Sequence, residues 1–318
     1  MKPRVFVSRP IPETALSILE KECSVEMWHS STVPPPISEK IRNVDGLLTY
    51  GHETVSREMM LESKRLKVIS VLGVGYDHVD VEAATELGIL VGNTPEILAG
   101  SAADLTFALL LAVARNIVPA NHYVRTGQWT ELDPSLFWGE EVHGSTLGIV
   151  GMGAIGRGVA RRASGFSMKT IYFKRKRRED WESELGIQYA SLSRLLRESD
   201  FVTLHLPLTT DTHHFIGRDE LREMKSTAYL INVARGPVVD PDALYEALQS
   251  RQIAGAALDV TEPEPLPVDH PLLDLDNLLI TPHIGTATRQ TRHKMAELAV
   301  QNLLAGLKGE PLLAQVLA

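Results

Sequence analysis

The chain contains one cysteine, Cys23, among 318 residues, which excludes a disulfide within the chain and a Cys-x-x-Cys metal site. It also has no apolar run approaching the roughly 20 residues that a transmembrane helix needs, since the run at 107–114 is far shorter. The first residues lack the apolar segment and cleavage site of a secretory leader. We therefore expect a cytoplasmic protein with no membrane anchor and no bound metal.

Positive charge is also in short supply, because 32 Lys and Arg face 40 Asp and Glu and give a net charge of −8. A chain with this balance is a poor partner for nucleic acid or for an anionic membrane surface. The apolar fraction of 44% and the charged fraction of 23% are ordinary for a globular protein, and the length predicts two domains.

Short apolar strands alternate with helices, which predicts α/β architecture with parallel sheets and βαβ crossovers. The predicted strands are 5–7, 46–50, 68–72, 89–91, 146–150, 170–173, 201–204, 228–232, 255–258 and 278–280. The pattern Ser101-Ala-Ala-Asp104 is typical of a helix cap, so we expect a helix from there to about Arg115. Helical spacing at 288–307 predicts a final helix that packs back on the N-terminal part.

A glycine fingerprint, Gly151-Met-Gly-Ala-Ile-Gly156, follows one predicted strand and opens a helix. In this arrangement Gly151 permits a tight turn, Gly153 lets the backbone approach a pyrophosphate, and Gly156 allows close helix–strand packing. Ala154 and Ile155 belong to the same turn. The fingerprint predicts a dinucleotide-binding site with the pyrophosphate at the helix N-terminus.

A basic run follows the second strand of this unit, where the adenosine ribose of a dinucleotide is bound. By itself such a run is typical of a solvated face or a targeting patch. An acidic residue in this place binds the ribose of NAD, whereas cations suit the 2′-phosphate of NADP. We therefore expect NADP(H) to be preferred, with NAD(H) possible. Arg175 is the main candidate because a guanidinium binds phosphate bidentately, and the supporting cations are Lys174, Lys176 and Arg177.

Three further phrases each follow a predicted strand: Asn232-Val-Ala-Arg-Gly236, Leu258-Asp-Val-Thr-Glu-Pro-Glu-Pro265 and Thr281-Pro-His-Ile-Gly285. Because the carboxyl ends of parallel strands meet at one edge of a sheet, four polar side chains should gather there: Arg235, Asp259, Glu264 and His283.

These phrases, with Gly75-Tyr-Asp-His-Val-Asp80 and Asn93-Thr-Pro95, resemble the D-isomer-specific 2-hydroxyacid dehydrogenase family, in particular its glyoxylate/hydroxypyruvate reductase branch. The resemblance extends along nearly the whole chain. It implies a Rossmann dinucleotide-binding domain (100–284) inserted in a smaller flavodoxin-like α/β substrate domain (1–99 and 285–318). It also implies an active site in the cleft between them and a homodimer.

The resemblance further implies that Arg235 binds the substrate carboxylate and carbonyl, that His283 transfers a proton, and that Glu264 is the partner of His283. It assigns the backbone amides of Val74 and Gly75 to the substrate carboxylate. Elementary chemistry agrees, because hydride transfer to a ketone leaves charge on oxygen that an acid must neutralise. Histidine titrates in the useful range, and a carboxylate beside it favours the imidazolium.

The resemblance also assigns Asp259 to the nicotinamide carboxamide. Other family positions carry over with less force, and those that would contact the cofactor are Pro207, Val233 and Gly285. Three residues border the substrate or serve packing alone, and the sequence leaves this open: Leu72, Tyr50 and Gly51. The chain departs from the family at Leu132, where the hydroxypyruvate-reducing branch can have a tryptophan directed to the partner subunit.

These observations predict an NADPH-preferring reductase that converts small 2-oxo acids, glyoxylate or hydroxypyruvate, into D-2-hydroxy acids. Reduction of 2-ketogluconate, another 2-hydroxyacid dehydrogenase activity, and oxidation of formate or phosphite are the alternatives among enzymes. A protein of another class, a dinucleotide-sensing corepressor, is also possible on this fold.

Overall fold

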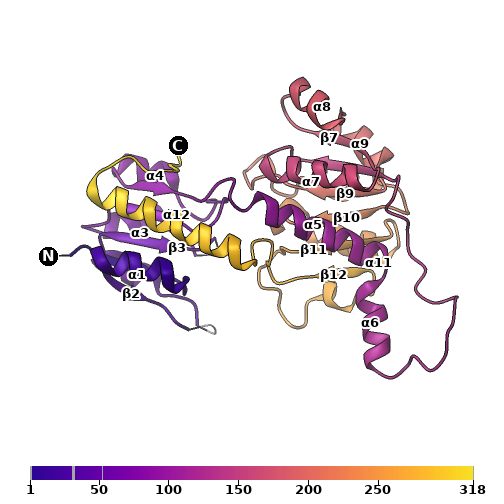
Figure 1. Ribbon diagram of the computed structural model, residues 1–318, viewed down its shortest axis with the longest axis horizontal. Coiled ribbons are helices and arrows are strands. Elements are labelled where there is room, and N and C mark those ends of the chain that lie inside the picture. The colour runs from indigo at the N-terminus through magenta and orange to yellow at the C-terminus, as the bar shows by residue number, and fades with distance from the viewer. Residues whose placement is uncertain (1, 31–32, 52, 318) are drawn as a thin grey trace. The chain divides into compact units, whose positions relative to one another are not determined.

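The structure is a computed structural model that describes residues 2–30, 33–51 and 53–317. The chain forms two compact units, one made of Met1–Leu98 with Thr286–Ala318 and the other of Ala99–Gly285. Each unit contains one parallel β-sheet with helices on both faces, which confirms the predicted fold class (Figure 1).

The sheet of the first unit has the order β2-β1-β3-β4-β5, which is the flavodoxin-like order 2-1-3-4-5. Its strands are β1 (Arg4–Val7), β2 (Ser24–Met27), β3 (Gly46–Thr49), β4 (Val68–Val71) and β5 (Leu90–Gly92). Its helices are α1 (Glu13–Glu22), α2 (Ile37–Lys40), the 3-10 turn η1 (Ile41–Asn43), α3 (Arg57–Glu62), α4 (Val81–Glu86) and α12 (Arg289–Lys308).

The last helix, α12, packs against β3, β4, β5 and α1, as predicted. Two glycines permit the close approach: a Cβ on Gly46 would lie 3.1 Å from Leu303, and one on Gly306 would lie 2.6 Å from Val68. The hydroxyl of Ser70 in β4 donates to the carbonyl of Ala299 at 2.8 Å. The first unit is therefore completed by residues from both ends of the chain.

The sheet of the second unit has the order β12-β11-β10-β9-β6-β7-β8. When its strands are numbered along the chain from β6, the six strands β6 to β11 have the Rossmann order 3-2-1-4-5-6. Its strands are β6 (Thr146–Val150), β7 (Lys169–Phe173), β8 (Gln188–Tyr189), β9 (Phe201–Leu204), β10 (Tyr229–Asn232), β11 (Gly255–Leu258) and β12 (Leu278–Ile280). Its helices are α5 (Ala99–Ala114), α6 (Ile117–Arg125), α7 (Ala154–Gly165), α8 (Glu179–Leu185), α9 (Leu192–Glu198), α10 (Arg218–Glu223), η2 (Gly236–Val238), α11 (Pro241–Gln249) and η3 (Pro271–Asp274).

Alternate residues of these strands point to opposite faces of the sheet. Ile149 and Tyr172 join the apolar cluster under α5 and α7, whereas their neighbours Val150 and Ile171 join the cluster under α9, α10 and α11. Both faces are therefore buried, which explains why the strands read as continuous apolar runs.

Some local predictions differ from the structure. The predicted cap at Ser101 is wrong, because α5 begins at Ala99 and the Ser101 hydroxyl donates instead to the carbonyl of Gly285 at 2.8 Å. Two strands, β2 and β8, were not predicted, and several helices of the structure, α6 among them, had no predicted range. In the described part of the chain no single helix meets the length and hydropathy of a membrane span; α5 with α6, bent by 64°, meets them only as a pair.

Candidate functional site

The glycine fingerprint forms a tight turn between β6 and α7. Gly151 has φ of 97°, and a Cβ there would lie 2.6 Å from the carbonyl oxygen of His205, so this position requires glycine. A Cβ on Gly156 would collide with the carbonyl of Gly151. Gly153 is different, because it is exposed and a Cβ there would meet no atom within 4 Å.

The N-terminus of α7 fits a dinucleotide pyrophosphate. Gly153 is its N-cap, and among the described residues no side chain caps the first turn, which includes Ala154 and Ile155. The Nε atom of Arg157 is buried and lacks a hydrogen-bond partner within the described chain. A phosphate group at a helix N-terminus would fill the open space over Gly153 and accept hydrogen bonds from the uncapped amides.

The basic run after β7 divides into two kinds of residue. Arg177 makes two 2.8 Å hydrogen bonds to the carboxylate of Glu182, and Arg178 pairs with Asp180. Arg175 and Lys176 are exposed, and no ion pair engages either within the part of the chain that the structure describes. The four predicted cations are therefore not equivalent, and Arg177 is already neutralised.

Lys174 belongs to a cluster of cations around the indole ring of Trp181. Its Nζ lies 4.6 Å from the ring centroid, and the guanidinium groups of Arg157 and Arg178 lie 4.8 and 4.1 Å from it. Lys174 Nζ also donates to the Met152 carbonyl in the glycine turn at 3.2 Å. Burial lowers the pKa of Lys174, and the positive charges of Arg178, Arg157 and Arg175 lower it further. Arg157 and Trp181 were not predicted to belong to this site, because their contact joins two different helices, α7 and α8.

A histidine–carboxylate pair lies at the carboxyl edge of β11 and β12. The Nδ1 atom of His283 lies 2.7 Å from Oε1 of Glu264. His283 has φ of 52°, a left-handed conformation that is uncommon for residues other than glycine. Its amide donates to the carbonyls of Asp259 and Thr281, both at 3.0 Å, and these bonds hold the turn.

Asp259 supports the loop that carries His283. Its buried carboxylate accepts hydrogen bonds from the Thr281 hydroxyl at 2.6 Å, the Ile284 amide at 2.8 Å and the Gly285 amide at 2.7 Å. The sequence resemblance gives this residue a cofactor contact, which stays a prediction. Its three observed hydrogen bonds also give it a structural role, because they stabilise the loop that carries His283.

Arg235 follows β10 in a turn that Asn232 organises. The Asn232 side chain accepts from the Ala234 amide at 3.0 Å and donates to the Arg235 carbonyl at 2.9 Å. The next residue, Gly236, lies so close to the backbone of Thr261 that a Cβ would collide with it. This close approach packs the turn that carries Arg235 against the segment that leads to Glu264. Val233, in the same turn, is half-buried, and Pro207 is exposed after β9.

Apart from Arg235, the predicted substrate residues lie in the first unit. Leu72 is buried after β4, and Val74 and Gly75 follow it in a loop held by the Asn93 side chain, whose Nδ2 donates to the Val74 carbonyl at 2.9 Å. Within the described residues the amides of Val74 and Gly75 have no internal acceptor. They are therefore available to an anion such as a carboxylate.

The loop of Tyr50 and Gly51 is anchored by Glu53, a buried residue that the sequence analysis did not single out. Its carboxylate accepts from Ser8 at 2.6 Å, Thr49 at 2.7 Å, the Tyr50 amide at 2.9 Å and Arg9 at 2.9 Å. Burial favours the neutral carboxyl, but these hydrogen bonds outweigh it and lower the pKa of Glu53. Burial raises the pKa of Tyr50, whose ring faces the Arg292 guanidinium at 5.9 Å.

Comparison with known proteins adds to this picture. The sequence model of a family described as D-isomer specific 2-hydroxyacid dehydrogenase, NAD binding domain, matches residues 107–285. A glyoxylate reductase of Korarchaeum cryptofilum is 48% identical over 98% of this chain and 94% of its own length. A crystal structure of a Thermus thermophilus protein has 46% identity and a TM-score of 0.92, covering 99% of this chain and 100% of its own. An NADPH-dependent glyoxylate/hydroxypyruvate reductase from Sinorhizobium meliloti, solved with NADP and malonate, has 33% identity and a TM-score of 0.85, covering 99% and 97% of the two chains.

Proposed function

The chain belongs to the D-isomer specific 2-hydroxyacid dehydrogenase family, and on this premise we propose that it reduces glyoxylate and similar small 2-oxo acids with NADPH. It is an oxidoreductase that uses a nicotinamide dinucleotide. The substrate, the choice of NADPH and the roles of individual residues are parts of the proposal. The observation that carries it is the 2.7 Å pair of His283 and Glu264 at the carboxyl edge of the dinucleotide-binding sheet.

The pair suits proton transfer to a substrate oxygen. When bound, the reduced nicotinamide supplies a hydride to the carbonyl carbon of the substrate. The carbonyl double bond becomes a C–O single bond, and its oxygen takes one proton from protonated His283. Because Nδ1 faces Glu264, we assign Nε2 as the proton donor. Glu264 keeps the ring oriented for this transfer.

The carboxylate of the 2-oxo acid needs fixed donors, and we assign two sets. In the first unit these are the amides of Val74 and Gly75, and Leu72, Tyr50 and Gly51 border the substrate. In the second unit Arg235 adds positive field near the developing alkoxide. Measurements of KM and kcat on single-residue variants distinguish these roles. Loss of a carboxylate contact should raise KM, whereas loss of His283 should lower kcat.

The decisive experiment compares purified wild type with His283→Gln in an assay of NADPH oxidation. Loss of a general acid should lower kcat for glyoxylate by about 10²–10⁴-fold. The matched control is His143→Gln, which changes an exposed histidine of the same unit and should leave kcat unchanged. The proposal fails if wild type oxidises NADPH with none of glyoxylate, hydroxypyruvate, pyruvate and 2-ketogluconate. Relative kcat/KM values for these acids identify the preferred substrate.

We assign the preference for NADPH to Arg175 and Lys176, supported by Lys174. The proposal rests on their exposure, on the absence of ion pairs to them within the described residues, and on the surplus of positive charge around Trp181. Loss of a charged hydrogen bond of about 1.5–3 kcal/mol predicts that Arg175→Ala weakens NADPH binding about 10–100-fold and leaves NADH binding unchanged. Arg177→Ala is the matched control, because its guanidinium is already paired with Glu182. Equal losses for both cofactors would remove the 2′-phosphate assignment.

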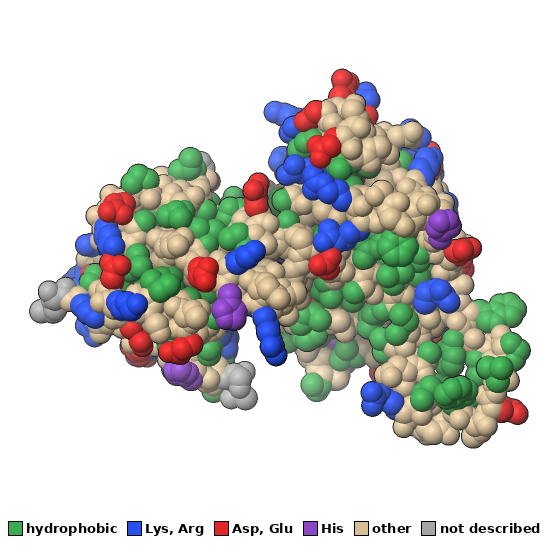
Figure 2. All heavy atoms as spheres, in the orientation of Figure 1, with side chains coloured by type: hydrophobic (Ala, Val, Ile, Leu, Met, Phe, Trp, Pro, Cys, Tyr) green, Lys and Arg blue, Asp and Glu red, His purple; other side chains and the backbone are tan. Residues whose placement is uncertain are grey.

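We also propose that the enzyme is a homodimer, with a second copy covering an apolar patch on α6 and the loop after it. Figure 2 shows apolar side chains gathered over this region. The exposed members are Ile117, Val118, Val124, Trp129, Leu132, Leu136, Phe137 and Trp138. Such a contiguous apolar patch marks an interaction surface.

Sedimentation velocity tests the dimer. Leu132→Asp should yield monomers, because it places a charge in the patch at a side chain that is 87% exposed and so costs little in folding. The control is Val268→Asp, at a residue that is 98% exposed and outside the patch. A wild type that sediments as a monomer at micromolar concentration would refute the assignment.

A further inference from the structure

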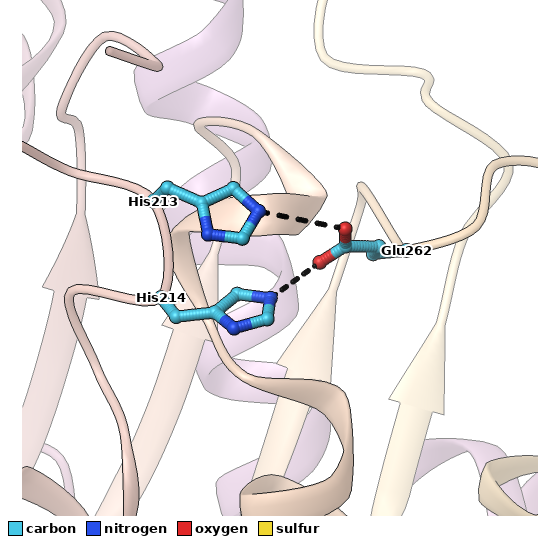
Figure 3. A group of neighbouring side chains, drawn as sticks. All are labelled: His213, His214 and Glu262. Atoms are coloured by element: carbon cyan, nitrogen blue, oxygen red, sulfur yellow. Dashed lines mark hydrogen bonds and ion pairs between the residues drawn. The ribbon is translucent and has the colours of Figure 1, made fainter. Parts of the chain in front are cut away.

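Two consecutive histidines and a glutamate meet on the second unit, outside the residues assigned to the reaction. The Nε2 atom of His214 lies 2.9 Å from one oxygen of Glu262, and Nε2 of His213 lies 3.8 Å from the other. The two imidazole rings stack with centroids 4.0 Å apart. Figure 3 shows both rings directed to the same carboxylate.

The backbone is arranged so that the two rings converge. The two histidines lie in a turn and not in a strand, so their side chains need not point to opposite sides. Within this turn His214 adopts a left-handed conformation with φ of 50°, which is uncommon for residues other than glycine. Its amide donates to the Pro237 carbonyl at 2.7 Å, and the Thr212 hydroxyl donates to the Pro207 carbonyl at 2.6 Å.

A single hydrogen bond between the loop of His213 and His214 and the loop of Glu262 does not account for this arrangement. One hydrogen bond, from His214 to Glu262, would join them without the second ring. Stacking His213 on His214 adds a second nitrogen donor facing the other oxygen of the same carboxylate. The two ring nitrogens and the two carboxylate oxygens thus form one set of donor atoms that a single ion could use.

We propose that His213, His214 and Glu262 form a binding site for a divalent transition-metal ion, with Zn²⁺ as the probe. Imidazole nitrogen and carboxylate oxygen are the donors that such ions prefer. One donor atom from each residue lies within 4.8 Å of the others. Zn–N and Zn–O bonds of about 2.0–2.1 Å place tetrahedral ligands roughly 3.3 Å apart, so only side-chain adjustments are required. Three protein ligands leave one position for water or a small anion.

The site connects the loop after β9 with the segment that carries Glu264, two residues beyond Glu262. A bound ion would hold this segment to the loop that contains Pro207. Binding of the ion itself does not depend on the proposed reaction, so the test below distinguishes failure of the one proposal from failure of the other.

The test is calorimetric titration of Zn²⁺ into the full-length protein, purified without a polyhistidine tag and treated with a chelator. Wild type should bind one ion per chain. Removal of residues that merely orient metal ligands costs about 10–100-fold in affinity, so His213→Ala and Glu262→Gln should each lose at least about tenfold. His143→Ala, which removes an exposed histidine elsewhere, should bind as wild type does.

Cobalt supplies a spectroscopic readout, because visible bands of a four-coordinate Co²⁺ complex should appear in wild type and be lost in His213→Ala. The side chain of His213 is 52% exposed, so this variant should fold even if Glu262→Gln does not. Equal Zn²⁺ affinity in wild type and His213→Ala would overturn the proposal, as would an equal loss in His143→Ala.

Discussion

Replacement of Asp259 by asparagine tests whether this buried acid supports the His283 loop. The side chain is 2% exposed and accepts three hydrogen bonds, two through Oδ1 and one through Oδ2 from the Gly285 amide. Asparagine keeps one oxygen but turns an NH₂ group toward a donor. One charged hydrogen bond is worth about 1.5–3 kcal/mol, and an unsatisfied buried amide adds to the loss, so we expect destabilisation of about 2–4 kcal/mol.

For a unit of this size, each kcal/mol lowers Tm by about 2–4 °C, so Asp259→Asn should unfold about 4–16 °C below wild type. Circular dichroism during heating measures the shift, with the exposed Asp269→Asn as the matched control. The value of kcat should fall as well, because the loop positions His283. The reasoning is refuted if Tm stays within about 1 °C of wild type while dinucleotide affinity falls, since Asp259 would then serve the cofactor alone.

Two other substitutions test the glycine turn and the Glu53 network. Gly153→Ala should leave Tm nearly unchanged, because a Cβ at this position meets no protein atom within 4 Å. It should weaken dinucleotide binding about 5–100-fold, because the added methyl group would collide with the pyrophosphate of a bound dinucleotide. Gly151→Ala should instead lower Tm, because φ of 97° and the His205 carbonyl oppose a side chain; the opposite pattern would contradict the assigned turn. Glu53 has a lowered pKa, so its stabilising effect is present above its unfolded-state pKa, about 4.3, and is lost as pH falls through the lower folded value. The Tm difference between wild type and Glu53→Gln should therefore be largest near pH 7 and shrink below about pH 4; a difference that grows in acid would show that the carboxylate is not the stabilising form.

Much of the fold was predictable from the chain because buried parallel strands are continuous apolar runs bounded by polar residues. The strand β2 was not predicted because it lies at the sheet edge. There Ser24 and Glu26 are exposed, so only every second residue of the strand is apolar. The helix α6 buries no residue, so its sequence has no apolar face directed to a core.

The candidate site was predictable where residues follow strands, because strand order brings their carboxyl ends to one edge. The supporting contacts were not predictable, because they depend on three-dimensional proximity between distant segments. Asp259 reaches the amide of Gly285 across 26 positions, and Arg157 meets Trp181 from another helix. Neither spacing follows a helical or strand period, so no pattern in the chain indicates it.

The division of the first unit between the two ends of the chain has a consequence for biosynthesis. Strands β1 to β5 leave the ribosome before residues 99–285, whereas α12, which covers one face of their sheet near Gly46, leaves after them. At about 5–20 residues per second, the intervening residues 99–285 take roughly 10–40 s to synthesise. During that time the sheet face that α12 will cover stays uncovered, while the dinucleotide-binding unit can already fold. The first unit is thus completed only after the whole dinucleotide-binding unit has been synthesised, and a chain that stops before Arg289 would leave its core open.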